Sequence, residues 1–237
     1  MNILVTICGR GGSKGIPGKN VKLLNGKPLV FYSIEVAKNF AIRYGADVSL
    51  STDDEQLKMV ASKFGLHTKY SRPQRLATDA AGKDEAIADL LFFEEKNRKK
   101  KYDFILDLDI TSPLRTLDDL TSGFEIIKND PNALNVFSVN PCNRNPYFNM
   151  VEQRDDGYYG LVKEGNFLTR QSAPKVYDLN ASFYFFRRMF FDLTGRPSIT
   201  NRSLIYVMPH ICFDLDHPID FEFMEYLMAN NKLGFDF

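Results

Sequence analysis

Short apolar runs alternate with segments of helical periodicity along the first half of the chain. Ile3–Cys8, Asp47–Ser51 and Tyr102–Leu108 have the length and composition of buried strands. Between them, helical spacing predicts one helix from Pro28 to about residue 40 and another over Lys83–Lys96. Strands that alternate with helices of this length predict βαβ units and a mainly parallel sheet.

Two further helices and one further strand are predicted in the same half. The acidic run Asp53-Asp54-Glu55 predicts a helix start, because carboxylates are favoured at the positive end of the helix dipole. Leu117–Lys128 predicts a helix, and His67–Tyr70 predicts a short strand.

The pattern changes near residue 140, where turn residues become dense and remain so to about residue 177. Two short alternating segments, Tyr158–Val162 and Asn166–Thr169, are separated by Lys163-Glu164-Gly165 and predict a β-hairpin. The rest of the chain predicts two returning strands and a closing helix: Asn180–Arg187, Ser203–Met208 and Pro218–Ala229.

These elements predict a three-layer α/β/α, Rossmann-like fold. Residues 1–139 and 178–237 form the predicted main domain, and residues 140–177 form a predicted inserted subdomain. The insertion is too short to bury a core of its own, and it carries several aromatic residues. We therefore expect it to pack against a second copy of the chain in a homodimer.

Composition excludes several classes of protein. The 237 residues include 30 Lys and Arg and 30 Asp and Glu, so there is no basic excess of the kind that binds nucleic acid or anionic membranes. The three cysteines are far apart, which argues against a disulfide framework or a zinc site and fits the cytoplasm. Apolar runs are too short for a membrane span or a signal sequence, so we expect neither nucleic acid nor membrane as a partner.

The predicted first strand leads directly into a glycine-rich loop at residues 9–20, GRGGSKGIPGKN. Its glycines allow the backbone to approach a ligand closely and to turn N–H groups toward an anion. Arg10, Lys14 and Lys19 add three cations. The carboxyl end of the first strand is where an α/β sheet binds nucleotides. The alternative is an ordinary connection between a strand and a helix.

Two common phosphate-binding motifs do not match this loop. A P-loop requires Ser or Thr after Gly-Lys, and Gly18-Lys19 is followed by Asn20. The dinucleotide motif G-x-G-x-x-G fails because Lys14 stands at the last glycine position. An NAD-dependent oxidoreductase is therefore disfavoured, and the cations suit a triphosphate.

Four segments together resemble the acylneuraminate cytidylyltransferases, the CMP-sialic acid synthetases and their relatives. The loop is similar to their R-x-x-S-K-G-x-P-x-K-N, and three further motifs follow in the family's order over nearly the whole chain. They are Arg72-Pro73-x-x-Leu76-Ala77-x-Asp79, Thr111-Ser112-Pro113-Leu114-Arg115 and Phe213-Asp214-Leu215-Asp216. The first and third motifs are highly specific, whereas the second and fourth are weak alone.

The resemblance implies a nucleotide-diphospho-sugar transferase type of fold and transfer of a cytidylyl group from CTP to a nonulosonic acid. It implies catalytic roles for Arg10, Lys19 and Asp216. The nucleotide-binding residues that it implies are Arg10, Gly11, Ser13, Lys14, Lys19, Asn20, Arg72 and Asp79. The substrate-binding residues that it implies are Asp109, Thr111, Ser112, Arg115, Asn149, Arg170, Gln171 and Asn180. It also implies a homodimer in which the partner's insertion reaches toward the sugar pocket.

Asp214 and Asp216 are the predicted metal ligands. Residues i and i+2 of a strand face the same side, so both carboxylates can meet one cation, with Asp220 one helical turn beyond. Hard oxygen ligands suit Mg²⁺, or Mn²⁺, which also binds substrate phosphates. The resemblance implies the same pair. The alternative role for Asp216 is to cap the helix that begins at Pro218.

Three positions depart from the sialic-acid branch of the family. Asp109 stands where that branch has Gln, Asn149 where it has Lys, and Asp178 where it has Arg. An ionised Asp109 only accepts hydrogen bonds, which suits a ligand with N–H donors such as a 7-acetamido group. We therefore expect a legionaminic-type sugar in preference to N-acetylneuraminic acid. The second motif also lacks the usual D-T-A-S, which weakens the assignment of base contacts there.

Two other functions remain open from the sequence. A 3-deoxy-manno-octulosonate cytidylyltransferase is disfavoured because its loop has Arg where this chain has Gly15. A non-catalytic nucleotide-binding protein of the same fold is disfavoured because both Asp214 and Asp216 are retained with the loop cations.

Overall fold

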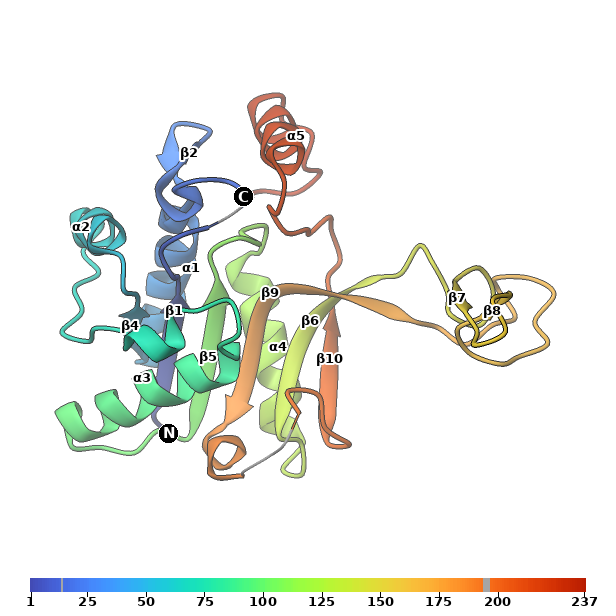
Figure 1. The fold of residues 1–237 in the computed structure, drawn as a ribbon. Helices are drawn as coiled ribbons and strands as arrows, with labels where there is room; N and C mark the ends of the chain where they lie inside the picture. Colours follow the sequence, from blue (N-terminus) through green and yellow to red (C-terminus); the bar gives the residue numbers. More distant parts are fainter. Residues whose placement is uncertain (14, 194–196) are drawn as a thin grey trace.

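A central sheet with helices on both faces, and an arm that extends away from it, make up the molecule (Figure 1). The computed structural model describes residues 1–13, 15–193 and 197–237. The sheet has six strands in the order β10-β6-β9-β5-β1-β4. β9 is antiparallel to both neighbours, whereas the pairs β5–β1, β1–β4 and β10–β6 are parallel. The predicted α/β fold with a mainly parallel sheet is confirmed.

The strands of the main sheet are β1 (Ile3–Cys8), β4 (Asp47–Ser51), β5 (Phe104–Asp109), β6 (Asn135–Pro141), β9 (Tyr177–Arg187) and β10 (Ser203–Val207). The helices are α1 (Leu29–Tyr44), α2 (Glu55–Lys63), α3 (Lys83–Arg98), α4 (Leu117–Asn129) and α5 (Pro218–Ala229). Two small ribbons are formed by β2 (Leu23–Leu24) with β3 (Lys27–Pro28) and by β7 (Val151–Gln153) with β8 (Tyr159–Leu161). None of the helices within the described residues is long and apolar enough to cross a membrane.

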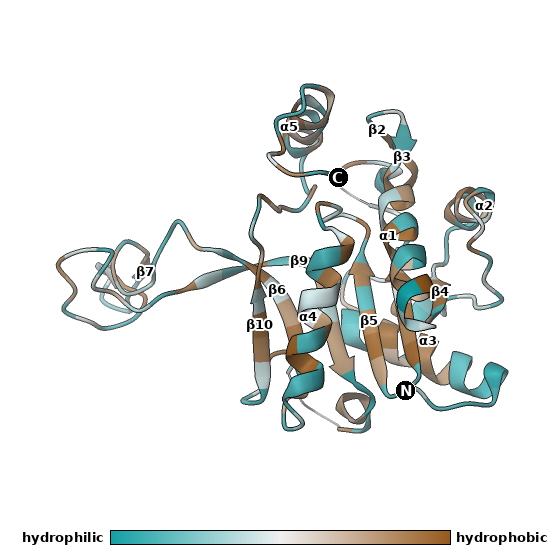
Figure 2. Cartoon of the chain, turned by 180° about the vertical axis from the view of Figure 1, so that it is seen from behind, coloured by the Kyte–Doolittle hydropathy of each residue, from teal (hydrophilic) through white to brown (hydrophobic). Residues whose placement is uncertain are grey.

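The two faces of the sheet bury separate apolar clusters. Helices α1 and α4 cover one face, and α3 covers the other (Figures 1 and 2). Because side chains alternate along a strand, Val5 and Ile7 of β1 pack toward the α1 and α4 side, whereas Leu4 packs toward α3. In Figure 2 the apolar colour is concentrated on the strands, and the outer sides of the helices are polar.

Strand β6 was not predicted from the sequence, because polar residues interrupt its apolar pattern. Asn135 and Ser138 are both buried there. The Asn135 side chain donates to the Ser198 carbonyl at 2.8 Å, and the Ser138 hydroxyl donates to Asn180 Oδ1 at 2.6 Å. These hydrogen bonds offset the desolvation that otherwise opposes polar residues in a central strand.

Two other predictions of local structure are wrong. Residues 67–70 form no strand. The predicted hairpin of Tyr158–Val162 with Asn166–Thr169 is absent from the described part of the chain: Tyr159–Leu161 instead pairs with the preceding Val151–Gln153 in a different hairpin. The turn lies at Asp156-Gly157, where Gly157 has φ 84°. Asp-Gly is a strong hairpin signal, because glycine adopts positive φ without steric cost.

The arm begins where β6 and β9 continue beyond the main sheet. Their pairing shifts register between Phe137 and Val139 and then runs on to Pro141 opposite Tyr177. Residues 142–176, with the β7–β8 hairpin, lie at the far end (Figure 1). The arm is therefore an extension of two core strands.

We predict that Thr116→Ala lowers the free energy of unfolding by about 1 kcal/mol. Thr116 caps α4: its hydroxyl accepts from the Asp119 N–H at 3.2 Å, and Asp119 Oδ2 accepts from the Thr116 N–H at 2.7 Å. Urea unfolding measures the change. Thr116→Ser keeps the oxygen and should retain most of the stability, so an equal loss in both variants would contradict the assignment.

Candidate active site

The carboxyl ends of three parallel strands meet at one edge of the sheet. Cys8 at the end of β1 lies opposite Ser51 of β4 on one side and Asp109 of β5 on the other. Residues that follow these strands therefore converge, although they come from distant parts of the sequence. The glycine-rich loop follows β1 and stands at the centre of this edge.

Hydrogen bonds and close packing fix the loop. The Gly11 N–H donates to Asp53 Oδ1 at 2.9 Å, and the Asn20 side chain donates to the Arg10 carbonyl at 3.1 Å. A Cβ on Gly15 would lie 2.3 Å from the Asp216 carbonyl oxygen, so only glycine fits between the loop and that segment. Of the predicted nucleotide-binding residues, Asn20 therefore shapes the loop, and Ser13 is half-buried within it. Lys14 lies outside the described residues.

A cavity of about 180 Å³ opens beside the loop. Four of the predicted site residues line it, together with Lys83, which was not predicted: the four are Arg10, Arg72, Asp79 and Asp109. Arg10 forms an ion pair with Asp79. Arg72 is buried, and its Nε and Nη2 donate to the hydroxyl and carbonyl of Ser51, each at 2.9 Å. The structure thus brings the first two sequence motifs together at one cavity.

Lys83 is the main residue at this edge that the sequence analysis missed. Its ammonium lies 2.8 Å from Asp107 Oδ2 and 2.8 Å from Asp109 Oδ2. Lys83 is also the first residue of α3, where the helix dipole disfavours a cation. A cation in this position was the available signal, because it requires acidic partners elsewhere, and the sequence contains Asp107 and Asp109 at positions i and i+2.

The ion pairs set the protonation of this cluster. Burial favours the neutral form of Asp109, but the nearby Lys83 ammonium and the hydrogen bonds from Thr111 outweigh it and lower the pKa of Asp109 to about 2. Burial likewise opposes the charge on Lys83, yet Asp107 and Asp109 raise the pKa of Lys83 well above its ordinary value. Lys83 and Asp109 are therefore both ionised at neutral pH.

Lys19 and Asp216, two of the predicted catalytic residues, lie side by side. Lys19 Nζ donates to the Leu215 carbonyl at 2.6 Å and lies 3.4 Å from Asp216 Oδ1. The Leu215 N–H donates to the Thr111 carbonyl at 2.9 Å. The loop, the third motif and the fourth motif are therefore joined through one short segment.

Asp214, one of the two predicted metal ligands, has a partly buried carboxylate at this edge of the sheet. Its Oδ1 is buried and has no hydrogen-bond partner within the described residues. Burial, followed by the negative charges of Asp109 and Asp216, raises the pKa of Asp214 to about 7. A buried carboxylate oxygen beside an exposed carboxylate is a donor set that fits Mg²⁺ or Mn²⁺, which bind one or two carboxylates together with substrate phosphates.

The local geometry around Asp216 differs from the expectation in two respects. Residues 213–216 are not part of a strand, so strand alternation does not align the two carboxylates. Asp216 is also not the helix cap: His217 occupies that position, and Asp220 Oδ2 accepts from the N–H groups of Asp216 and His217. Capping therefore occupies Asp220 and leaves the Asp216 carboxylate available.

The third motif, residues 111–115, packs beneath the site and makes hydrogen bonds to the end of β5. Thr111 donates through its N–H and its hydroxyl to Asp109 Oδ1, each at 2.8 Å. Ser112 and Arg115 are buried. Arg115 donates to the carbonyls of Ser112 at 2.6 Å and Asp109 at 2.8 Å. In this structure Ser112 and Arg115 hold the end of β5 in place and do not face the cavity.

The remaining predicted substrate residues lie on or near the arm. Asn149 accepts from the Asn145 N–H at 2.7 Å, and Arg170 and Gln171 are exposed. Asn180 is buried at the base of the arm, where it donates to Asn140 Oδ1 at 2.6 Å. The chain therefore does not bring Asn149, Arg170 and Gln171 to its own loop.

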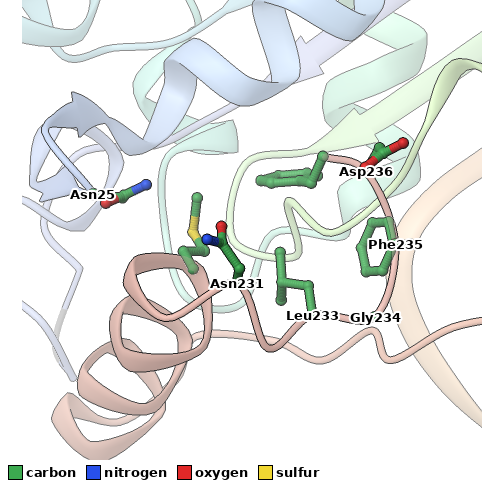
Figure 3. Close-up of a pocket in the computed structure, with 8 residues that line it drawn as sticks. Asn25, Asn231, Leu233, Gly234, Phe235 and Asp236 are labelled. Carbon is green, nitrogen blue, oxygen red and sulfur yellow. The ribbon is translucent and has the colours of Figure 1, made fainter.

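A larger cavity of about 650 Å³ lies elsewhere, between Asn25, the end of α5 and the last residues of the chain (Figure 3). It is lined mainly by Leu233, Phe235, Phe237 and uncharged polar groups, with Asp236 as its charged side chain. Because it contains none of the loop cations or the acidic cluster, size alone does not make it the reaction site.

The comparisons with known proteins agree with the motifs. The family model described as Cytidylyltransferase matches residues 4–233. The chain belongs to this family. The resemblance drawn from the four sequence motifs is thereby confirmed.

Similar proteins cover the whole length of this cytidylyltransferase. Post-translational flagellin modification protein B of Campylobacter coli is 38% identical over 231 residues, which cover 98% of this chain and 97% of the relative. CMP-N,N'-diacetyllegionaminic acid synthase of Campylobacter jejuni is 36% identical over 232 residues, with the same coverage. A solved structure of CMP:2-keto-3-deoxy-manno-octonic acid synthetase complexed with CTP has a TM-score of 0.68 at 16% identity and covers 98% of this chain and 100% of its own. That structure shows the shared fold.

The pKa of Asp109 predicts part of the acid sensitivity of this cytidylyltransferase. Folding lowers that pKa from 3.8 to about 2, so the carboxylate stabilises the fold above pH 3.8 and this contribution disappears as the pH falls to about 2. The wild type should therefore lose about 2 kcal/mol more of its unfolding free energy across this window than Asp109→Asn. Urea unfolding at a series of pH values measures it, and the exposed Asp118→Asn should behave as the wild type; equal acid sensitivity in all three proteins would contradict the assignment.

Proposed function

We propose that this protein transfers the cytidylyl group of CTP to the anomeric hydroxyl of a nonulosonic acid of the sialic or legionaminic type. The products are the CMP-sugar and pyrophosphate. The observation that carries the proposal is the junction at the loop, where Lys19, Leu215 and Asp216 meet beside the buried, unpartnered oxygen of Asp214. At this junction a cation that can bind a triphosphate, Lys19, lies beside carboxylate oxygens that can bind a divalent metal, those of Asp214 and Asp216.

The residues of the junction match what nucleotidyl transfer requires. Such transfer depends mainly on positioning and on neutralising charge at the phosphates. Arg10 and Lys19, with Lys14 from the same loop, bind the phosphates of CTP in this proposal. Asp214 and Asp216 hold Mg²⁺ or Mn²⁺, which neutralises phosphate charge when bound. The base of the nucleotide enters the cavity lined by Arg72 and Asp79.

Asp109 and Asp178 do not explain a preference for a legionaminic-type sugar, because both carboxylates already have partners within the chain. Both oxygens of Asp109 already accept hydrogen bonds, Oδ1 from Thr111 and Oδ2 from Lys83, so Asp109 is not a free acceptor for a 7-acetamido group. Asp178 likewise accepts from the Cys142 thiol at 2.9 Å. The preference rests instead on the relative from Campylobacter jejuni, whose name gives diacetyllegionaminic acid as its sugar.

We also propose a homodimer in which the arm of one subunit completes the sugar site of the other. The arm exposes apolar side chains that a monomer would leave in water: Met150, Val151, Tyr158, Tyr159, Val162, Leu168, Tyr177 and Leu179. It also carries Asn149, Arg170 and Gln171 away from the chain's own loop. Burial of these groups against a second arm would account for both features.

The reaction takes place in the cytoplasm in this proposal. The thiols of Cys8, Cys142 and Cys212 are free, and free thiols persist in reducing compartments. The sugar product would then enter the biosynthesis of a surface polysaccharide.

Pyrophosphate release tests the reaction. Purified protein with CTP and Mg²⁺ is incubated with N-acetylneuraminic, legionaminic and pseudaminic acids, and kcat/KM should be highest for legionaminic acid. 3-Deoxy-manno-octulosonate serves as the outside comparison. The absence of pyrophosphate with every nonulosonic acid would overturn the proposal, and tight CTP binding without turnover would favour a non-catalytic nucleotide-binding protein.

Asp216→Asn should lower kcat by at least about a hundredfold, because it removes one charge from the metal ligands at the reacting phosphate. The carboxylate is exposed, so the melting temperature should change little. Exposed Asp118→Asn is the matched control. Full activity of Asp216→Asn would show that the metal pair has been misassigned.

Light scattering at micromolar concentration should give the mass of two chains. Tyr158→Asp combined with Leu168→Asp should shift the protein toward the monomer, because both side chains are exposed on the arm. Ile42→Asp alters an equally exposed apolar residue on α1 and should leave the mass unchanged. A monomeric wild type would refute the dimer.

A further inference from the structure

The Lys83 ammonium lies in an unusual setting at the edge of the nucleotide cavity. It stands at the first position of α3, where the helix dipole is unfavourable to a cation. Asp107 and Asp109 hold it at 2.8 Å each, and the ring of Tyr184 lies 4.9 Å away. Asp107 is fully buried, and its other oxygen accepts from the Thr6 hydroxyl at 2.7 Å. The cation is therefore held by groups that themselves have little freedom to move.

Two carboxylates do not use all the donors of this ammonium. A lysine ammonium has three N–H donors and accepts nothing. Within the described residues, Asp107 and Asp109 are the carboxylates at ion-pair distance. Lys83 also lines the cavity of about 180 Å³, and one third of its side chain is exposed. One donor is therefore left for a ligand in that cavity.

The other two cations of the cavity also contact protein acceptors. Arg10 is paired with Asp79, and two nitrogens of Arg72 donate to Ser51. The cavity is smaller than the 300 Å³ or so that encloses a drug-sized ligand. It can therefore take one flat ring of a larger substrate and cannot enclose a nine-carbon sugar.

We propose that Lys83 is a specificity-determining residue of the nucleotide site, whose ammonium donates a hydrogen bond to an acceptor on the edge of the pyrimidine base. Asp107 and Asp109 are its positioning residues. Cytosine offers two acceptors on this edge, O2 and N3, whereas uracil offers O2 but carries a proton on N3. This inference rests on the proposed function, because it takes CTP as the substrate.

Three variants separate the donor from the charge of the cluster. Lys83 with two carboxylates carries a net charge of −1, and the double variant Lys83→Met/Asp107→Asn keeps that charge while removing the ammonium. Asp107→Asn alone is the reference that retains Lys83. Lys96→Met removes an exposed lysine from the same helix and should keep the CTP affinity of the wild type. Thermal unfolding confirms that each variant is folded.

Calorimetry with CTP and UTP, without sugar, gives the readout. Relative to the wild type, whose cluster carries the same net charge, the double variant should bind CTP about 10- to 100-fold more weakly, the loss expected for one hydrogen bond to a charged group. Asp107→Asn shows what the loss of Asp107 alone contributes. Its KM for the sugar should stay within about twofold. Loss of CTP affinity with unchanged UTP affinity assigns the contact to N3 and supports the proposal, whereas an equal loss for CTP and UTP would overturn the role of Lys83 in base specificity.

Unchanged CTP affinity in the double variant would overturn the role of Lys83, as would a loss confined to the sugar KM. If the double variant does not fold, Lys83→Gln/Asp107→Asn retains an N–H donor and should bind CTP more tightly than Lys83→Leu/Asp107→Asn. Equal CTP affinity in that pair would also overturn the inference. A wild type that neither binds CTP nor releases pyrophosphate would instead refute the proposed function.

Discussion

Two pairs of carboxylates lie at the carboxyl edge of the sheet, and each pair is beside a different lysine. Lys83 lies beside Asp107 and Asp109, and Lys19 lies beside Asp216, which is two residues after Asp214 in the chain. The Lys83 ammonium lies between its two carboxylates and helps to keep Asp109 ionised within the fold. Lys19 lies beside Asp216 and leaves Asp214 with an unpartnered oxygen. Without Lys83, burial would raise the pKa of Asp109, just as burial and the neighbouring negative charges raise the pKa of Asp214. The separation places Asp107 and Asp109 around Lys83 and leaves Asp214 and Asp216 as the pair proposed to hold a metal.

The surrounding elements are arranged to maintain this separation. Helix α3 starts at Lys83, which places the ammonium within reach of β5. The unfavourable interaction of a cation with the positive end of the helix dipole is offset by the two carboxylates. Thr111 supplies two further hydrogen bonds to Asp109, and the buried Arg115 secures the backbone of the same turn. The third motif is thus explained by the stability of the strand end, which is a role that sequence similarity alone does not reveal.

The sequence predicted the features that depend on local periodicity and short-range chemistry. Apolar spacing predicted strand β4, and Pro218 predicted the start of helix α5. The structure has both elements at these positions. Strand β6 was missed because Asn135 and Ser138 look exposed until their distant partners Ser198 and Asn180 are known. Lys83 was missed for the same reason: its acidic partners lie more than twenty residues away and meet it only through the parallel sheet. The features that could not be predicted are therefore buried polar side chains, because the groups that pair with them are distant in the sequence.

The arm poses a different physical problem from the rest of the chain. Its two strands continue β6 and β9 past the register shift at Phe137, so its direction is fixed by the core, yet its end exposes Tyr158, Tyr159 and Leu168. A two-stranded ribbon has too little apolar contact to be rigid by itself. In the proposed homodimer, the apolar face of this ribbon packs against the second subunit, and the residues that the ribbon carries away from its own loop lie at that contact. The same contact that would order the arm would therefore also bring Asn149 and Arg170 to a sugar site, which links assembly to substrate binding through a single buried surface.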